Sequence, residues 1–300
     1  MTTLALDRYD RHMPFFDGTV VLPAGLELDA LQVGQQEQLR DGRHRHRRML
    51  VDREFDAAET SFSSYIVARS QGLPFTALPV FPRRLFSQGQ VFVNADAGIE
   101  GPADLAGRKV GLQSFQTTLA VLAKGDLATD HGVPLDSISW RVHRMDTLAT
   151  DAARRFDIAP LADGVDLATA LAVGDIDALF FSRTPVPATG PTDRIRRLYP
   201  DPRAAERDYF ARHGFWPIMH IVALSETAVA ANPSLPQQLF AAFRSAAEIS
   251  AGYLRDPNWS QLAWGKYALD EERRAFAEPL WTSGVAANRA NVERFVDYSF

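Results

Sequence analysis

The sequence predicts an α/β fold, in which helices alternate with the strands of sheets. Two stretches carry this prediction, because each reads as a strand, a polar turn and a helix: residues 55–72 and residues 109–130. The first continues into another strand at 78–81, and this β-α-β order is typical of parallel pairing. Hydrophobic residues make up 46% of the 300 residues, which is enough to fill one large core or two smaller ones.

The first residues predict two strands joined by a polar loop. The strands are expected at 3–6 and 26–33, and the loop at 7–12 follows the end of the first strand. Such a loop is either solvated or part of the wall of a binding site, and the sequence leaves both interpretations open. In the second case, Arg11 and His12 are candidates for ligand contacts.

The stretch 40–48, with the sequence RDGRHRHRR, is the densest cluster of charge. It predicts the start of a helix that ends near Val51 and turns a basic face to solvent. His44 and His46 would point apart on that helix, which argues against a shared metal ion. Among the arginines, Arg48 is the candidate to reach a ligand.

The stretch 55–86 combines a strand, a helix and a second strand around several polar residues. The first strand ends near Ala58, Thr60 and Ser61 are expected to cap the helix, and Gly72 ends it. A helix N-terminus attracts anions, because its free N–H groups point outward and its dipole favours negative charge. The residues expected to hold a carboxylate there are Ser63, Ser64, Arg83 and Arg84.

The rest of the chain predicts further strands and helices. Strands are expected at 90–94, 109–113, 140–143, 177–181 and 216–224. Helices are expected at 118–130, 168–174, 203–212, 235–254, 270–278 and 288–298, and residues 144–165 are expected to be irregular. Polar loops follow two of the strands, and His220 lies in the middle of the last, otherwise apolar strand.

Composition excludes several classes of protein. The net charge of −5 argues against nucleic acid as a partner. Cysteine is absent, which excludes disulfides, thiolate metal sites and a cysteine nucleophile. The first residues lack the features of a signal peptide and no stretch is apolar enough to cross a membrane, so a cytoplasmic protein is expected if the chain is complete.

Several motifs resemble those of known proteins. The stretches GIEGPADLAGRKVGL and ALAVGDIDALFF are similar to type II periplasmic-binding-protein-like chains. The motifs EFDAAETSFSSYIVARS, PVFPRRLFSQ, FVNADAGI, RLYPD, FWPIMHIV and GVAANR resemble the 4,5-dihydroxyphthalate decarboxylase family. Together with DRYDRHMPFFDG near the N-terminus, they cover nearly the whole chain up to residue 289.

The resemblance implies a two-lobed type II periplasmic-binding-protein-like fold with a ligand cleft between the lobes. Lobe 1 is expected to hold residues 1–95 and 216–300, and lobe 2 residues 96–215. Such a fold closes on its ligand when the lobes move about their hinges. Three polar loops are expected to line the cleft, namely those at 59–64, 114–118 and 182–184.

The resemblance also implies a decarboxylase that needs no cofactor. No H-E-x-x-H or comparable metal-binding motif is present, so no metal is expected. The substrate of the decarboxylase would be a dihydroxylated aromatic dicarboxylate, such as 4,5-dihydroxyphthalate, which would yield 3,4-dihydroxybenzoate. The ring carbon that loses carbon dioxide must gain a proton, while a deprotonated ring hydroxyl supplies electrons. The site therefore needs acid–base groups and cations that hold the second carboxylate.

The acid–base candidates are His220, His12 and Glu59, with Tyr9 as a weaker one. A histidine in an apolar strand is more often a neutral core residue, but the resemblance favours a function for His220. A carboxylate such as Glu59 is a poor neighbour for a substrate carboxylate unless it is protonated. The candidates for substrate binding are Arg84, Arg183, Arg83, Arg11, Ser63, Ser64, Gln116, Thr117, Phe115 and Phe81. The alternative roles of these residues are surface charge, helix capping and core packing.

One departure from the family keeps other functions open. Related sequences often carry a histidine just after the FPxR segment, where this chain has Ser87-Gln88-Gly89-Gln90. The alternatives are a small-anion-binding protein without catalysis, and a different lyase, such as a dehydratase, that acts on a carboxylated ring. The expected partner is a small aromatic carboxylate, without nucleic acid or membrane, and the sequence leaves self-association open.

Overall fold

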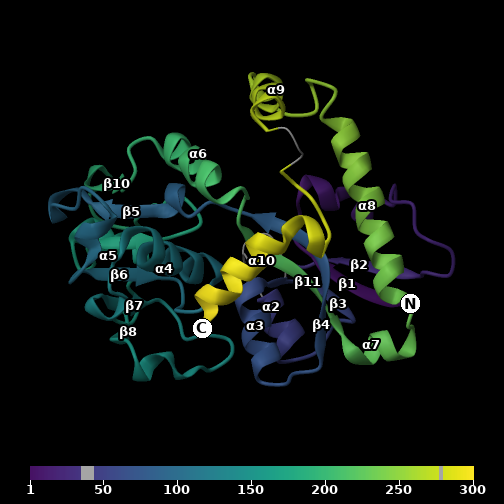
Figure 1. The fold of residues 1–300 in the computed structure, drawn as a ribbon, viewed down its shortest axis with the longest axis horizontal. Coiled ribbons are helices and arrows are strands. Elements are labelled where there is room, and N and C mark those ends of the chain that lie inside the picture. Colours follow the sequence, from purple (N-terminus) through teal and green to yellow (C-terminus); the bar gives the residue numbers. More distant parts are fainter. Residues whose placement is uncertain (35–43, 277–279) are drawn as a thin grey trace. The chain divides into compact units, whose positions relative to one another are not determined.

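The computed structural model describes residues 1–34, 44–276 and 280–300, and its strands and helices alternate as expected (Figure 1). The contacts divide the chain into two units. Unit 1 consists of Met1–Ser61, Ala68–Arg83 and His220–Asn288. Unit 2 consists of Phe62–Val67, Arg84–Met219 and Arg289–Phe300. None of the helices among the described residues combines the length and the apolar character that crossing a membrane requires.

The described strands of unit 1 form a five-stranded sheet in the order β2-β1-β3-β11-β4. β1 runs parallel to β2 and β3, and β11 runs antiparallel to β3. His220 on β11 lies opposite Ser61 on β3, so its side chain is on the same face of the sheet as that of Glu59. The bounds are Thr2–Leu6 for β1, Leu28–Gln32 for β2, Ala57–Ser61 for β3, Phe75–Arg84 for β4 and Ile218–Ser225 for β11. The ends of β4 and β11 belong to unit 2.

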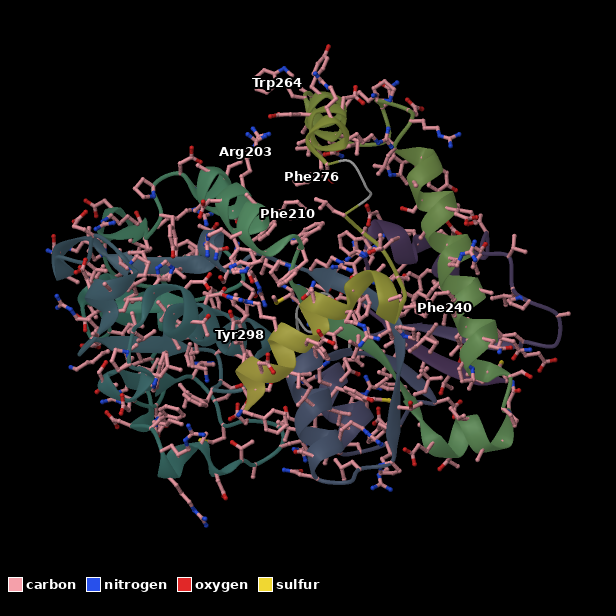
Figure 2. The ribbon with its side chains drawn as sticks, in the orientation of Figure 1. Arg203, Phe210, Phe240, Trp264, Phe276 and Tyr298 are labelled. Carbon is pink, nitrogen blue, oxygen red and sulfur yellow. The ribbon has the colours of Figure 1, made fainter. Side chains whose placement is uncertain are left out.

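Unit 1 buries its core between this sheet and α8, which spans Leu235–Tyr253. Leu235, Leu239, Ala242 and Phe243 recur at helical spacing and pack against strand residues such as Leu4 and Val222. The other helices are α1 (Met13–Asp17), α2 (Arg45–Leu50), α7 (Glu226–Ala231) and α9 (Gly265–Ala275). Every residue of α9 is exposed or half-buried, and Trp264 just before it points outward (Figure 2).

The described strands of unit 2 form a six-stranded sheet in the order β10-β5-β9-β6-β7-β8. β9, β6, β7 and β8 are parallel, whereas β5 is antiparallel to β9 and β10. The bounds are Val91–Asn94 for β5, Lys109–Leu112 for β6, Ser139–Val142 for β7, Ile158–Pro160 for β8, Ala178–Phe180 for β9 and Ile195–Arg197 for β10. Trp140 is fully buried in the core beside this sheet.

The helices of unit 2 follow the sequence signals at their ends. The N-cap Thr117 accepts a hydrogen bond from the backbone of Ala120, and the left-handed Gly132 follows the last residue of the helix. Asp166 caps the next helix in the same way. The bounds are Thr118–His131 for α4, Leu167–Val173 for α5 and Pro202–His213 for α6. Two helices contain residues of both units, α3 (Phe62–Ser70) and α10 (Val285–Ser299).

The structure differs from the expected elements at several places. Thr60 and Ser61 are the last residues of β3 rather than caps, because β3 is paired with β11 up to Ser61. The strand β5 pairs with β9 and β10, so residues 84–95 lie in unit 2 and not with the first strands. Residues 289–300, which were expected in lobe 1, also lie in unit 2. The irregular stretch 144–165 contains the short strand β8.

Candidate functional site

Glu59 lies at the centre of a buried polar cluster in unit 1, which we call the Glu59 cluster. All five residues of β3 are buried, and the side chain of Glu59 has no exposed surface. Its Oε1 accepts hydrogen bonds from the hydroxyl of Tyr9, at 3.2 Å, and from Nδ1 of His220. Its Oε2 accepts from the backbone N–H of Asp7, at 3.1 Å, and lies 3.1 Å from Nη2 of Arg45.

Arg45 is the cation of this cluster, and its side chain is fully buried. It begins α2, which follows the basic residues in the sequence. Its Nε donates to the backbone carbonyl of Glu59 at 2.8 Å, and its Nη1 donates to that of Val33. Nη1 also lies 3.6 Å from the carboxylate of Asp7. These partners offset the cost of removing a guanidinium from water.

The charges of the Glu59 cluster follow from its contacts. Burial alone would raise the pKa of Glu59, but the charge of Arg45 and the hydrogen bond from His220 outweigh it and hold that pKa well below its usual range. Burial lowers the pKa of His220, and the carboxylate of Glu59 offsets part of this effect. At neutral pH the cluster therefore contains an ionised Glu59, a positive Arg45 and a neutral His220.

The hydrogen bond to Glu59 also fixes the tautomer of His220. An ionised carboxylate only accepts hydrogen bonds, so Nδ1 of His220 must carry the proton that lies between them. The neutral ring then has its lone pair on Nε2. A histidine oriented by a buried carboxylate is the arrangement used by general-base histidines.

His46 is a second buried histidine beside this pair. Its ring lies 5.1 Å from that of His220, and its Nδ1 accepts a hydrogen bond from the backbone N–H of Ser61 at 3.2 Å. Burial lowers its pKa well below the usual value. The expectation that His44 and His46 point apart is wrong, because α2 begins only at Arg45 and the two rings are 4.9 Å apart. Among the residues that the structure describes, no group of three or more His, Cys, Asp or Glu could hold a metal ion.

The polar loop after β1 packs against the Glu59 cluster. The guanidinium of Arg11 lies between the rings of Tyr9 and Trp281, 4.1 Å from each, and its Nε donates to the carbonyl of Pro82 at 2.7 Å. His12 is buried, with Nδ1 2.8 Å from the carbonyl oxygen of Asp7. Burial lowers the pKa of His12 to about 4. Both residues thus pack within the fold, and a role in ligand binding or catalysis stays a prediction.

The two arginines at the end of β4 have separate environments. The charge of Arg83 acts on Tyr9 and His220, so Arg83 belongs to the surroundings of the Glu59 cluster. Arg84 is buried, donates to the carbonyl of Trp216 at 2.8 Å in unit 2, and has a pKa lowered to about 10 by burial. Successive side chains of a strand point to opposite faces, which accounts for the difference. On the same strand, Phe81 is buried.

Several of the other predicted binding residues meet in unit 2. Ser63, at the start of α3, donates to the carbonyl of Gln116 at 2.5 Å, and the N–H of Gln116 donates to Asp146 at 2.8 Å. Thr117 caps α4. The remaining residues occupy different environments: Ser64 is half-buried, Phe115 packs in the core against Trp140, and Arg183 is exposed. Ser63 of the stretch 59–64 thus contacts Gln116 of the stretch 114–118, and a role of these residues in binding a ligand stays a prediction.

The sequence did not indicate that Arg45, His46 and Asp7 belong to this cluster. The basic run was interpreted as a solvated face, with Arg48 as the residue to reach a ligand, but Arg48 pairs with Glu54. The signal that could have corrected this is Glu59, because a carboxylate in the middle of a buried strand requires a cation nearby. The basic run at 44–48 is the nearest source of such a cation in the sequence.

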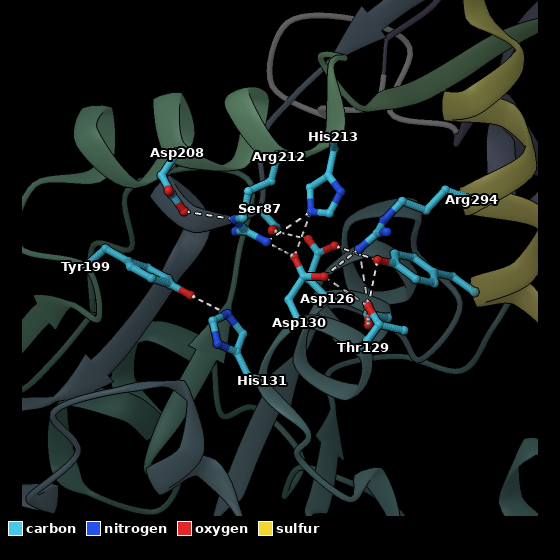
Figure 3. A network of polar contacts seen from close by, with 12 residues as sticks. Ser87, Asp126, Thr129, Asp130, His131, Tyr199, Asp208, Arg212, His213 and Arg294 are labelled. Atoms are coloured by element: carbon cyan, nitrogen blue, oxygen red, sulfur yellow. Dashed lines mark hydrogen bonds and ion pairs between the residues drawn. The ribbon is translucent and has the colours of Figure 1, made fainter.

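A second polar cluster lies in unit 2 and joins α4, α6 and α10 (Figure 3). Asp130 on α4 accepts from Arg212 at 2.7 Å, from His213 at 2.9 Å and from Arg294 at 2.6 Å. Asp126, one helical turn earlier, accepts from two hydroxyl groups: that of Ser87 at 2.7 Å and that of Tyr298 at 3.0 Å. We call this set the Asp126 cluster. Its contacts tie three helices together, which is a structural role.

Two curated proteins that are similar to this chain carry the same name. The 4,5-dihydroxyphthalate decarboxylase of Comamonas testosteroni is 29% identical over 303 residues, which cover 98% of this chain and 89% of the relative. The 4,5-dihydroxyphthalate decarboxylase of Pseudomonas putida is 28% identical over 215 residues, which cover 69% of this chain and 80% of the relative. The resemblance seen in the sequence motifs is thereby confirmed.

Solved structures share the fold at low sequence identity. Protein AF1704 from Archaeoglobus fulgidus superposes with a TM-score of 0.56 at 11% identity, over 99% of this chain and 96% of that one. An ABC transporter protein from Parabacteroides distasonis superposes with a TM-score of 0.50 at 9% identity, over 100% of this chain and 91% of that one. At such identities the likeness shows the fold alone.

A family model described as NMT1/THI5 like matches residues 41–195, just over half of the chain. The match includes Arg45 and Glu59 of the Glu59 cluster, but not His220, and most of the sheet of unit 2. The predicted α/β class, of the type II periplasmic-binding-protein-like kind, is confirmed by this match together with the two sheets. The chain therefore belongs to the NMT1/THI5-like family.

Proposed function

We propose that this protein is a decarboxylase of a dihydroxylated aromatic carboxylate, with His220 as its acid–base group. The observation that carries this proposal is the buried pair of Glu59 and His220, whose hydrogen bond leaves Nε2 as the basic nitrogen of the imidazole. The names of the two relatives support the reaction and the substrate class, with 4,5-dihydroxyphthalate as the first compound to test.

The neutral imidazole of His220 suits the removal of a proton from a ring hydroxyl. Nε2 takes that proton, and the ionised Glu59 stabilises the imidazolium that forms. The electrons of the phenolate then move toward the ring carbon that bears the carboxylate. When this carbon accepts the proton from Nε2, its bond to the carboxylate breaks, carbon dioxide leaves, and the bonding electrons restore the aromatic ring. The phenolate of the product takes its proton from water.

Glu59 has an orienting role in this proposal, because both of its carboxylate oxygens already have hydrogen-bond or ion-pair partners. Its two oxygens already accept from Tyr9, His220 and the N–H of Asp7, and they pair with Arg45. A carboxylate with so many donors is a weak base. Glu59 therefore acts on the reaction through His220, while Arg83, whose charge reaches His220, is the candidate to hold a substrate carboxylate.

The test is to incubate chelator-treated protein with 4,5-dihydroxyphthalate and to follow carbon dioxide and 3,4-dihydroxybenzoate. We expect turnover, and we expect His220→Asn to reduce kcat by about 10²–10⁴-fold, the usual contribution of a general acid–base group. The matched control is His131→Asn, because His131 is an exposed histidine of unit 2. Turnover that survives in His220→Asn would remove His220 from the mechanism. Saturable binding without turnover would instead indicate a small-anion-binding protein.

A further inference from the structure

Arg45 is a fully buried cation beside the proposed acid–base pair, and the reaction above has no step for it. Its guanidinium contacts three acceptors from two segments: the carboxylate and the backbone carbonyl of Glu59 on β3, and the carbonyl of Val33 just after β2. A planar guanidinium can serve these acceptors at once because its five N–H groups lie in a fixed fork.

The contacts of Arg45 bear on Glu59 in two ways. The bond from Nε to the backbone carbonyl fixes Arg45 to the same residue whose side chain it pairs with. The positive charge, 3.1 Å from Oε2, favours the ionised carboxylate. The opposite oxygen, Oε1, is the one that holds Nδ1 of His220. Arg45 and His220 therefore occupy opposite sides of one carboxylate.

We propose that Arg45 is a positioning residue that keeps Glu59 ionised and thereby holds His220 as the neutral Nδ1–H tautomer. This inference rests on the proposed function for its catalytic meaning, but it concerns the protonation of the pair, which can be measured without substrate. With Arg45 present, its positive charge balances the negative charge of Glu59, so His220 stays neutral.

Other titratable and charged groups face the pair from every neighbouring segment. The ring of His46 from α2 lies 5.1 Å from that of His220, and the charge of Arg83 from β4 disfavours the positive form of His220. His12 acts on Glu59, and Tyr9 and Asp7 donate to it. The Asp7 carboxylate lies 3.6 Å from Nη1 of Arg45, so it shares the same cation. Removal of Arg45 would leave the carboxylates of Glu59 and Asp7 without the buried cation that both of them contact.

The test is an NMR titration of His220 in the full chain, with the imidazole nitrogens labelled and the signals assigned by His220→Asn. In the wild type we expect the neutral Nδ1–H tautomer from pH 8 down to below pH 6.5. In Arg45→Gln we expect the pair to take up a proton at a pH about 1–3 units higher, the usual effect of a neighbouring charge. That proton appears either as an imidazolium or as a protonated Glu59 with the His220 tautomer reversed.

Two further variants separate the charge of Arg45 from its contribution to the fold. Arg45→Lys keeps the positive charge but not the fork, so we expect wild-type protonation of His220 together with lower thermal stability. Arg47→Gln is the matched control, because Arg47 is an exposed arginine of the same helix. Here we expect no change in the titration.

The proposal is overturned if His220 titrates identically in Arg45→Gln and the wild type. If Arg45→Gln does not fold, the carboxyl carbon of Glu59 is titrated in the wild type instead. A Glu59 that protonates at or above pH 4.3, the ordinary value for a glutamate, overturns the proposal as well. A protein without turnover whose His220 responds to Arg45 as described would contradict the proposed function and leave this inference standing.

Discussion

The Glu59 cluster and the Asp126 cluster each bury a carboxylate, and the two carboxylates have opposite properties. Both side chains are almost inaccessible, yet the pKa of Glu59 is held well below its usual range while burial raises that of Asp126 to about 7. The difference lies in the donors. Glu59 pairs with the guanidinium of Arg45, whereas Asp126 accepts from two neutral hydroxyl groups. The partner, more than the depth of burial, decides which acid stays ionised.

Within unit 2, two carboxylates that are one helical turn apart also have opposite pKa shifts. Asp130 lies four residues after Asp126 on α4 and forms ion pairs with Arg212 and Arg294 (Figure 3). Burial would raise its pKa, but the hydrogen bonds from Arg212 and His213 lower it to about 2. The cations of α6 and α10 are therefore directed at one of two neighbouring acids, which leaves the other to the hydroxyl groups.

Replacement of Glu59 by an amide should have the largest effect on stability. In Glu59→Gln the guanidinium of Arg45 stays buried without its countercharge, so we expect a loss of about 3–5 kcal/mol in the free energy of unfolding, measured by urea denaturation. The control is Glu226→Gln, which breaks an exposed pair with Arg69 and should cost at most about 1 kcal/mol. A Glu59→Gln protein as stable as this control would show that Glu59 is not the charged partner of Arg45.

A methyl group at Gly125 should disturb the Asp126 cluster to a smaller degree. A Cβ at Gly125 in α4 would collide with the ring of Tyr298, the residue that donates to Asp126. We expect Gly125→Ala to lower the free energy of unfolding by about 1–3 kcal/mol through overpacking, again in urea. Gly252→Ala is the control, since a Cβ there meets open space in α8, and it should be neutral or stabilising. Equal stabilisation by both changes would refute the close contact.

At acidic pH the smallest effect is expected from an amide at Asp126, because an amide resembles the protonated acid. The folded pKa is raised above the unfolded one, so this group stabilises the fold at low pH and loses that contribution as pH rises toward 7. We expect the wild-type free energy of unfolding to fall by up to about 1.4 kcal/mol per pH unit from this source between pH 5 and 7.

Asp126→Asn should abolish that dependence, so the variant should gain stability relative to the wild type as the pH rises from 5 to 7. The control is the exposed Asp17, whose pKa is lowered by hydrogen bonds from Thr19, so Asp17→Asn should not alter the slope in this range. Denaturation at pH 5, 6, 7 and 8 measures both variants. A slope that persists in Asp126→Asn would mean that another group titrates there.

The sequence predicted the course of the chain better than the composition of its site. Strand and helix signals are local, so the helices expected at 118–130 and 168–174 lie where the structure has α4 and α5. His220 was noticed because it interrupts an apolar strand. The burial of Arg45 depends on Glu59, fourteen residues further on, and on the carbonyl after β2, and charge density along the sequence carries no information about such pairing.

The predicted end of β4 illustrates a further limit. The strand was expected at 78–81, which left Arg83 and Arg84 in a loop where both could face one ligand. The structure extends β4 to Arg84, and the alternation of a strand then separates the two side chains. An error of a few residues in the length of a strand is therefore enough to change which face of the sheet a side chain is expected on.

The path of the chain between the units has a consequence for folding. The chain passes from one unit to the other at residues 61/62, 67/68, 83/84, 219/220 and 288/289, so neither unit is a continuous piece of sequence. Residues that must meet are consequently far apart along the chain: β3 pairs with β11 across more than 150 residues, and α10 reaches α4 from the other end. Such non-local contacts slow folding. A nascent chain cannot complete the strand pairing of β3 until synthesis has passed residue 225, and neither unit can be obtained as a simple fragment.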